Sequence, residues 1–413
     1  MGILLQYFPS KTFVVNSRTF DFLEKEGDAV KIAVLGYGTV GAGVYQMLLD
    51  VPGMEAGPVL VRPGKAVEPF QVDDAALIFG DPTVDAVVET LGGLDPAYSY
   101  GIRALEAGKH FITANKAMVA AHGLELASLA REKGTAFLFS AACGGGVLFL
   151  HNLALSAETD RIEAVSGILN GTTNYMLDAM QRRGLSYADA LREAKSLGYA
   201  EADPTADVSG LDALRKMQLA CAVAFGVLPQ SGMLCEGMEH FTAADVEDIQ
   251  GRGLVCRLIA SGCRAGDSVS AYVEPVLFPR AAPESSVFAN NNMARYSGRR
   301  CGSIVLMGQG AGRFPTASAV LRDLAAAQQG ARAMFPENCR AAEADNRAAV
   351  HMYYIRTGGF AAVRLPLRAV LAQGDVVRAV TEPMSVEKMH ALAQNIRKDG
   401  NDLFFAALEE ELC

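Results

Sequence analysis

Several common signals are missing from this 413-residue sequence, and each absence excludes a class of protein. Lysine and arginine (37) are fewer than aspartate and glutamate (46), the net charge is -9, and no basic block occurs. We therefore expect no nucleic-acid partner. No stretch supplies the roughly 18 uninterrupted apolar residues of a membrane span, and residues 1–8 lack the features of a signal peptide. We expect a cytoplasmic protein with no membrane partner.

Metal and disulfide chemistry also lack support in the sequence. The six histidines never take the H-x-x-x-H spacing of a zinc site. The eight cysteines include no C-x-x-C pair and lie mostly in apolar surroundings. We expect reduced thiols.

The chain is long enough for two or three domains, because single cores stop growing at roughly 250 to 300 residues. Strand-like and helix-like segments alternate along its first third, which predicts an α/β fold with βαβ units and a parallel sheet. These segments are residues 31–35, 40–49, 59–61, 86–89, 99–107, 110–113 and 123–133. Residues 1–28 precede them, and their two apolar runs, 3–8 and 12–15, could form a hairpin.

Beyond about Cys143 the strands and helices become longer, which predicts a second domain reaching to about residue 306. Residues 144–146 are three glycines and could form a hinge. A tail begins at about residue 346. It has the pattern of a strand, a helix, a strand and a helix, at residues 351–356, 367–373, 376–380 and 386–396.

The first motif with chemical meaning is a glycine-rich turn between an apolar strand and an amphipathic helix. It contains Gly36, Gly38, Thr39, Val40 and Gly41 in a G-x-G-x-x-G pattern. The glycines permit a tight turn, close approach of the backbone to a pyrophosphate, and packing of the helix on the strand. An ordinary turn is the alternative, but the flanking strand and helix favour a dinucleotide cofactor at these five residues.

The segment after the second strand bears on the choice between NAD and NADP. An NAD site usually places an acidic residue there, on the ribose 2′-hydroxyl. This chain has Arg62 with Lys65 nearby, whereas Glu55 precedes the expected strand. Arginine can face a 2′-phosphate, so we favour NADP, with NAD still possible and a solvated surface pair as the alternative.

Two further segments carry candidate catalytic groups. Lys116 follows the strand at residues 110–113, at the sheet edge where α/β proteins hold ligands. Four carboxylates and one lysine fall within residues 201–216, and the S-x-x-D spacing from Ser209 predicts a helix with Asp212 and Lys216 at i and i+4. Most such pairs are solvated and structural. Here, however, the carboxylates could hold an ammonium group while a lysine donates a proton.

Together these motifs resemble those of homoserine dehydrogenase over roughly residues 30–330, in order and in spacing. The matching segments are residues 36–41, 105–109, 113–116, 167–175, 198–216 and 310–320. The resemblance implies NAD(P)H-dependent reduction of aspartate semialdehyde to homoserine, on the route to threonine and methionine. It also implies a homodimer or homotetramer.

The resemblance further implies three domains after the extension at 1–28. They are a Rossmann domain at 29–142, completed by 307–340, an α+β substrate and dimerisation domain at 143–306, and a divergent ACT-like α+β domain at 346–413. Lys116 and Lys216 become the proton-transfer groups, and Asp212 orients Lys216. The residues that resemble the family's amino-acid pocket are Gly171, Thr172, Tyr199, Glu201 and Asp207, and Thr90 and Gly310 join the cofactor candidates.

Hydride transfer to an aldehyde leaves an alkoxide, and a nearby acid that protonates it is worth about 10² to 10⁴-fold in rate. Two close lysines should lower the pKa of one of them, whereas Asp212 opposes that shift. Which lysine gives the proton is open.

The chain departs from the family at two places. Residues 140–148 read Ser-Ala-Ala-Cys-Gly-Gly-Gly-Val-Leu where the family has Glu-Ala-Ser-Val-Gly-Gly-Gly-Ile-Pro. That loop helps to hold a monovalent cation in the family, so Ser140, Cys143 and Gly145 are the candidates for such an ion. In the tail, residues 357–360 replace the family's Arg-Pro-Gly-Val turn, and feedback binding of threonine is a hypothesis.

Two other functions fit these departures. One is a catalytically weak paralogue that binds NADP(H) as a sensor or scaffold. The other is a reductase of a different small 2-amino aldehyde, because pocket size cannot be read from the sequence.

Overall fold

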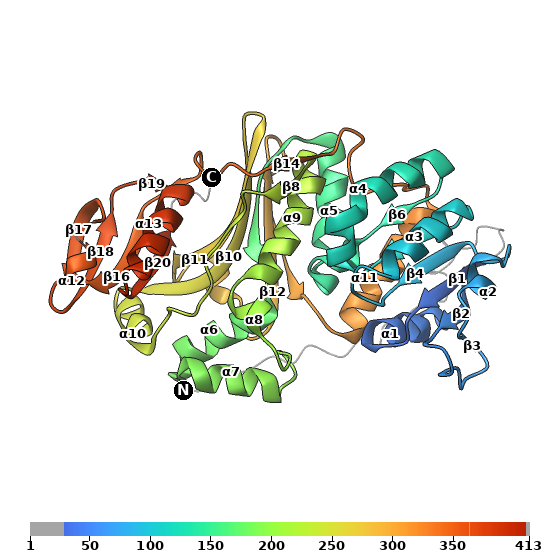
Figure 1. Cartoon of the computed structure of the whole chain (residues 1–413), viewed down its shortest axis with the longest axis horizontal. Coiled ribbons are helices and arrows are strands. Elements are labelled where there is room, and N and C mark those ends of the chain that lie inside the picture. The colour runs from blue at the N-terminus through green and yellow to red at the C-terminus, as the bar shows by residue number, and fades with distance from the viewer. Residues whose placement is uncertain (1–28, 363, 410–413) are drawn as a thin grey trace, which may run out of the picture.

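The computed structural model describes residues 29–362 and 364–409. Figure 1 shows three parts side by side: an α/β unit, a central part with long strands, and a C-terminal unit at the opposite end. The hairpin predicted within residues 1–28 lies outside the described residues. In the part of the chain that is described, no helix is long and apolar enough to cross a membrane.

The first unit is built on six parallel strands in the order β3-β2-β1-β4-β5-β6, as the α/β prediction required. Its strands are β1 (Val30–Leu35), β2 (Met54–Leu60), β3 (Gln71–Val72), β4 (Ala86–Glu89), β5 (His110–Thr113) and β6 (Phe137–Leu138). Its helices are α1 (Thr39–Leu48), α2 (Ala76–Phe79), α3 (Ala97–Glu106) and α4 (Lys116–Lys133). The central strands β1 and β4 are almost wholly apolar and buried, because helices cover both faces of a parallel sheet.

The chain returns to this unit after crossing the central part. Helix α11 (Arg313–Gln328) packs against α1, where Gly43 leaves room for Arg313: a Cβ at Gly43 would lie 2.8 Å from Arg313 Cγ. Beyond α11, the N–H of Phe137 donates to the carbonyl of Arg332 at 2.7 Å. The segment after the central part therefore closes one edge of the first sheet.

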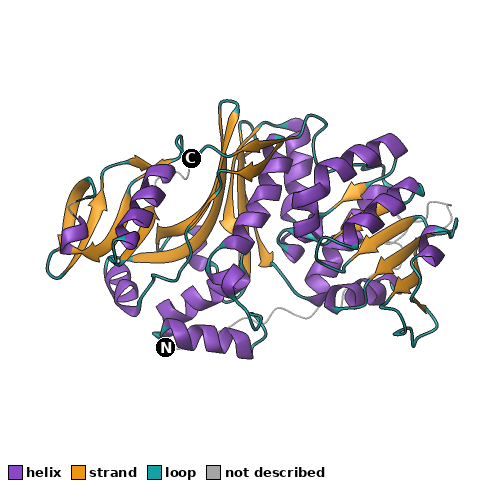
Figure 2. Ribbon diagram, in the orientation of Figure 1, coloured by secondary structure: helices purple, strands orange, loops and turns teal. Residues whose placement is uncertain are grey.

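The central part is a mixed ten-stranded sheet that continues into the C-terminal unit (Figure 2). Its order is β13-β12-β7-β10-β11-β20-β16-β18-β17, with β9 paired to β11. The central strands are β7 (Ile162–Ile168), β9 (Leu234–Cys235), β10 (Leu254–Ala265), β11 (Ser268–Pro279), β12 (Asn291–Gly298) and β13 (Gly302–Gln309). The α-helices around them are α5 (Phe149–Thr159), α6 (Gly171–Arg183), α7 (Tyr187–Ser196), α8 (Thr205–Val208), α9 (Leu211–Phe225) and α10 (Ala243–Gly251).

Helix α9 joins the first unit to the central sheet. All of its residues from Met217 to Phe225 are buried, as in a core helix that is covered on every side. It packs on β7, β10 and β11 and also touches α4 and α5. Short 3-10 turns η2 (Ser140–Ala142), η3 (Gly145–Val147) and η4 (Pro283–Ser286) and the strand pair β8 (Val227–Ser231) with β14 (Arg340–Glu343) complete this region.

The C-terminal unit has the element order β-α-β-β-α-β. The elements are β16 (Tyr353–Gly358), α12 (Gly359–Ala362), β17 (Leu367–Ala372), β18 (Val376–Thr381), α13 (Val386–Lys398) and β20 (Leu403–Leu408), with the small pair β15 (Val350–His351) and β19 (Met384–Ser385) beside them. Its strands pair antiparallel in the order β20-β16-β18-β17, the arrangement of a ferredoxin-like unit. Strand β20 then pairs in parallel with β11 through Val276 and Leu277.

Three local predictions were wrong. The segment predicted as a helix at 367–373 is the strand β17, because pairing with β18 decides its structure over a helix-like apolar spacing. Glu55 lies inside β2, which begins at Met54; Gly57 and Pro58 hid this strand. The helix after Ser209 begins at Leu211, and Gly210, with φ +82°, is its N-cap residue in place of Ser209.

The cysteines fit the expectation of reduced thiols only in part. Within the described residues six cysteines are free, at positions 143, 221, 235, 256, 301 and 339. Cys263 is disulfide-bonded, which corrects the expectation at this position.

One buried ion pair connects the C-terminal unit to α10, and its removal should lower the stability measurably. Arg356 donates to Asp245 Oδ1 at 2.7 Å, to Asp402 Oδ2 at 2.5 Å and to the His240 carbonyl at 2.9 Å. The Asp245 side chain is fully buried. Arg356→Leu should lower the free energy of unfolding by about 3–5 kcal/mol, because it leaves a buried carboxylate without its cation. Urea unfolding followed by circular dichroism measures it.

The matched control is Arg347→Leu, which removes an arginine whose side chain is 74% exposed and paired with Asp345. It should change stability by less than about 1 kcal/mol. Equal losses in the two variants would contradict the importance of the Arg356 pair.

Candidate active site

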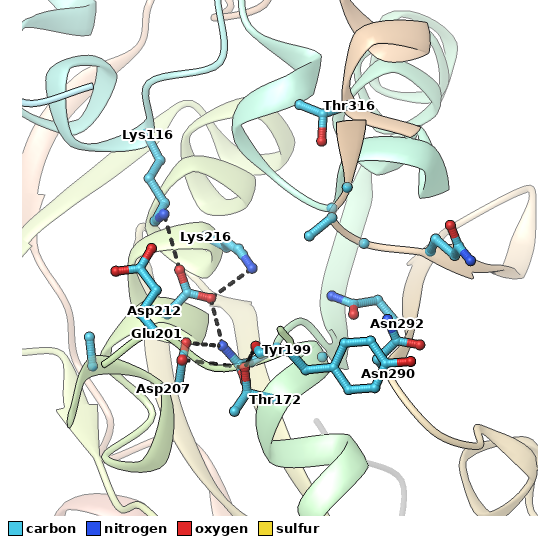
Figure 3. Close-up of a pocket in the computed structure, with 18 of the residues that line it drawn as sticks. Lys116, Thr172, Tyr199, Glu201, Asp207, Asp212, Lys216, Asn290, Asn292 and Thr316 are labelled. Atoms are coloured by element: carbon cyan, nitrogen blue, oxygen red, sulfur yellow. Dashed lines mark hydrogen bonds and ion pairs between the residues drawn. The ribbon is translucent and has the colours of Figure 1, made fainter. Parts of the chain in front are cut away.

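A cavity of about 640 Å³ lies where the first unit meets the central part (Figure 3). It brings together Lys116, Asp212, Lys216 and all five residues predicted for the amino-acid pocket, together with Gly310. Residues that the sequence analysis did not single out also line it. They include Ala114, Asn170, Arg215, Asn290, Asn292, Gln309 and Thr316.

The Asp212 carboxylate is held between the two candidate lysines. Lys116 Nζ lies 3.1 Å from Asp212 Oδ1, and Lys216 Nζ lies 2.7 Å from Oδ2. Lys116 is the first residue of α4, whose N-terminus is capped by Asn115, whereas Asp212 and Lys216 lie one helical turn apart on α9. The predicted i,i+4 pair is confirmed. The carboxylate also connects the two units, because its two cations come from different ones.

Asn170 organises the acidic side of the cavity. Its Nδ2 donates to Asp207 Oδ1 at 2.7 Å and to Asp212 Oδ2 at 2.9 Å. Its Oδ1 accepts from the N–H of Thr173 at 2.8 Å, so the same side chain caps α6. The Asn-Gly-Thr-Thr run at the start of α6 is a helix-start signal that could have identified Asn170.

The charges of the cavity shift the acidity of its groups in opposite directions. Burial would raise the pKa of the Asp212 carboxyl, but Lys216 and Lys116 outweigh burial and hold that pKa well below its usual range. Burial would lower the pKa of Lys216, yet Asp212 raises it above its ordinary value. The opposing effect of Asp212 expected from the sequence is confirmed for Lys216, whose pKa is raised and not lowered.

The substrate candidates line the side of the cavity that carries the acidic groups. Thr172 Oγ1 donates to the Tyr199 carbonyl at 2.5 Å and to Asp207 Oδ2 at 3.3 Å. Burial raises the pKa of Asp207, and the hydrogen bond from Asn170 opposes this. Glu201 is exposed at the mouth of the cavity. This arrangement presents carboxylates to a small cationic group.

The glycine turn fits a dinucleotide by its shape. Gly36 has φ +99°, which favours glycine, and a Cβ at Gly41 would lie 2.0 Å from the Gly36 carbonyl oxygen. Nothing lies within 4 Å of a Cβ built at Gly38, and α1 begins at Thr39 without a side-chain cap. The N-terminus of α1 is therefore open to a phosphate.

The other cofactor candidates lie around this turn. Thr90 donates from Oγ1 to the Leu35 carbonyl at 3.0 Å, so its hydroxyl supports the backbone of the turn. Arg62 and Lys65 follow β2, outside the cavity described above, and both are exposed. The sequence analysis missed Glu89, a buried carboxylate at the end of β4 that accepts from Thr113 Oγ1 at 2.5 Å and from the N–H of Leu91 at 2.6 Å.

In the loop proposed to bind a cation, the Ser140 side chain is already hydrogen-bonded to a buried carboxylate. Ser140 donates from N and Oγ to Asp323, at 2.7 and 2.5 Å. Burial raises the pKa of the Cys143 thiol to about 12. Among the described residues no group of three or more His, Cys, Asp or Glu side chains could hold a metal. The cation at Ser140, Cys143 and Gly145 stays a prediction.

Leu148, where the family has proline, takes a left-handed backbone with φ +55°. Proline is locked near φ −65° and cannot adopt that backbone. The loop between the two units therefore follows a path at Leu148 that a proline would exclude.

A parallel sheet with a dinucleotide turn, opening onto a cavity with a buried lysine–carboxylate chain, defines a nicotinamide-dependent oxidoreductase. The sequence models for the homoserine dehydrogenase NAD-binding domain and for homoserine dehydrogenase match residues 36–140 and 149–325. Homoserine dehydrogenase of Corynebacterium glutamicum is 40% identical over 73% of this chain and 72% of its own length. That of Bacillus subtilis is 34% identical over 74% of each chain.

Solved structures agree. The crystal structure of a homoserine dehydrogenase from Thiobacillus denitrificans superposes with a TM-score of 0.81, at 29% identity, over 92% of this chain and 98% of its own. The chain belongs to the homoserine dehydrogenase family. The alternative readings as a sensor or as a reductase of another aldehyde gain no support from these relatives.

The burial of Asp323 predicts a pH-dependent stability, which its hydrogen bonds from Ser140 oppose only in part. Burial raises the pKa of Asp323 to about 7, against the ordinary 3.8. The folded state therefore keeps a proton that the unfolded state releases, so the stability contributed by this group falls as pH rises from about 4 to about 7. Between pH 5 and pH 8 the loss should be about 2–3 kcal/mol. Asp323→Asn should remove this part of the pH dependence.

Urea unfolding of both proteins at pH 5 and pH 8 measures the difference. The variant should gain stability relative to the wild type as pH rises. A constant difference across that range would show that Asp323 is ionised in the folded protein.

Proposed function

We propose that this chain reduces L-aspartate 4-semialdehyde to L-homoserine, with a lysine as the proton donor. The observation that carries the proposal is the Asp212 carboxylate held between Lys116 and Lys216 in a cavity beside the dinucleotide turn. Family membership supports the same reaction.

The cofactor and the side chains supply different parts of the reaction, the hydride and the proton. When bound, the reduced nicotinamide supplies the hydride that the aldehyde carbon accepts. Asp212 keeps Lys216 as an ammonium group, and one of the two lysines gives its proton to the alkoxide oxygen. Two of the three donors of Lys216 already have partners, Asp212 and the Leu169 carbonyl at 2.5 Å, which leaves the third for the substrate. Glu201 and Asp207 face the substrate ammonium.

We also propose NADP as the favoured cofactor. The support is Arg62, two residues beyond the end of β2, with Lys65 close by. The basic pair stands where an NAD site has a carboxylate. Rates with NADPH and NADH, compared in the assay below, measure the preference, and faster turnover with NADH would contradict it.

The domain division is a proposal as well. We propose a Rossmann domain at 29–142 completed by 307–340, a substrate domain at 143–306, and an ACT-like domain at 346–413, with one adjustment. Because β13 runs to Gln309, we move the boundary expected at residue 306 to residue 309. The antiparallel order β20-β16-β18-β17 supports the last assignment. Calorimetric titration with millimolar threonine tests a regulatory role, and the absence of binding heat would remove it.

We further propose a homodimer or homotetramer. The supporting observation is β13, the outer strand of the ten-stranded sheet, which exposes Val305 and Met307. Exposed apolar side chains on one strand are typical of a subunit contact. Light scattering gives the mass, and a monomer at working concentration would contradict the proposal.

Turnover of Lys216→Ala tests the catalytic proposal. The wild type should oxidise NADPH with aspartate semialdehyde, and Lys216→Ala should lose about 10² to 10⁴-fold in kcat because the alkoxide loses its acid or its positioning. Binding of NADPH, followed by its fluorescence, should be unchanged.

The matched control is Lys133→Ala, at the far end of α4, where the lysine side chain is exposed and paired with Glu132. That variant should keep its turnover. Near-normal kcat for Lys216→Ala would remove Lys216 from the mechanism, and an inactive wild type would contradict the reaction itself.

A further inference from the structure

Asn292 has no partner for either half of its carboxamide. The side chain lies near the start of β12, is 2% exposed and lines the cavity. Neither Nδ2 nor Oδ1 makes a hydrogen bond. Asn174 also has one unpaired buried atom, but its Nδ2 donates to three carbonyls. Across residues 29–362 and 364–409, Asn292 is the amide side chain with both polar atoms buried and unpaired.

Two glycines leave the space around this amide. A Cβ at Gly310 would lie 2.2 Å from Asn292 Cγ and 2.3 Å from Nδ2. A Cβ at Gly171 would lie 3.5 Å from Asn292 Oδ1. The amide therefore lies between the glycine loop after β13 and the N-terminus of α6. Figure 3 shows it pointing into the cavity, toward the side where Lys216 lies.

Leaving both amide groups unpaired in a buried place costs about 1–3 kcal/mol for each group, so a native structure pairs them with something. The surroundings select the partner. Gly171, which lies beside the amide, is the first residue of α6, the positive end of a 13-residue helix, where an anion is stabilised. Asp207 and Glu201 lie on the acidic side of the cavity and suit a cation.

We propose that Asn292 is a substrate-positioning residue whose Nδ2 donates to the α-carboxylate of the amino-acid substrate. The inference rests on the proposed function and adds a specificity determinant to it. An α-amino acid carries a carboxylate and an ammonium on one carbon, so a single ligand offers an acceptor for Nδ2 and a donor for Oδ1. Asn292 thereby places the substrate between α6 and Lys216.

The test compares two substitutions in the homoserine oxidation assay with NADP. Asn292→Ala should raise the KM for homoserine about 10- to 100-fold, the value of a hydrogen bond to a charged group, with little change in kcat. Asn292→Asp should raise that KM further, because it puts a second carboxylate against the substrate's own. The NADPH dissociation constant should stay within twofold, which also shows that both variants fold.

Asn291→Asp is the matched control. It makes the same change one residue away, at a side chain that donates to the Phe288 carbonyl and does not line the cavity. Its KM for homoserine should match the wild type.

Three results would overturn the inference: an unchanged homoserine KM in Asn292→Ala, a lower KM in Asn292→Asp than in Asn292→Ala, or a loss confined to NADPH binding. The last result would show that the Asn292 side chain pairs with the carboxamide of the nicotinamide and not with the substrate. A wild type that neither binds homoserine in a calorimeter nor oxidises it would instead contradict the proposed function.

Discussion

The site depends on one buried carboxylate, that of Asp212, which is paired with a lysine from each of two structural units. A buried charge is tolerated only when it is paired and hydrogen-bonded, and Asp212 has both lysines and the Asn170 amide. Lys116 begins a helix of the parallel sheet, whereas Asp212 and Lys216 belong to α9 on the mixed sheet. The pairing can form only when the two units meet, so the same interaction links the fold and its chemistry.

The Asp212 carboxylate also determines where the positive charge of the cavity lies. Because it raises the pKa of Lys216, the proton needed for an alkoxide stays on the ammonium. Asp207 and Glu201 face the same space without a lysine partner of their own, and α6 presents its positive end nearby. A zwitterionic amino acid fits this arrangement, with its ammonium group toward Asp207 and Glu201. Asn292 lies where the carboxylate of that amino acid would be. The glycine turn of α1 leaves the neighbouring space for the dinucleotide.

Local pattern was enough to predict the parallel sheet, the glycine turn and the Asp212–Lys216 pair, because each depends on residues a few positions apart. It failed where distant segments decide the structure. Residues 367–373 have helical spacing but form β17 by pairing with β18, and nothing near β11 indicates that β20 will pair with it. Asn292 and Asp323 become significant only through burial and through partners, or their absence, far along the chain. The balance between burial and Asp212 that raises the pKa of Lys216 likewise required the structure.

The measurement that tests this account most directly is the turnover of Asp212→Asn, which keeps the shape of the side chain and removes its charge. Without the shared carboxylate, the two lysines lose their common partner and repel each other. We predict at least about a 100-fold loss of kcat with aspartate semialdehyde, with NADPH binding unchanged. A kcat within twofold of the wild type would show that the carboxylate between the lysines is not what makes this cavity an active site.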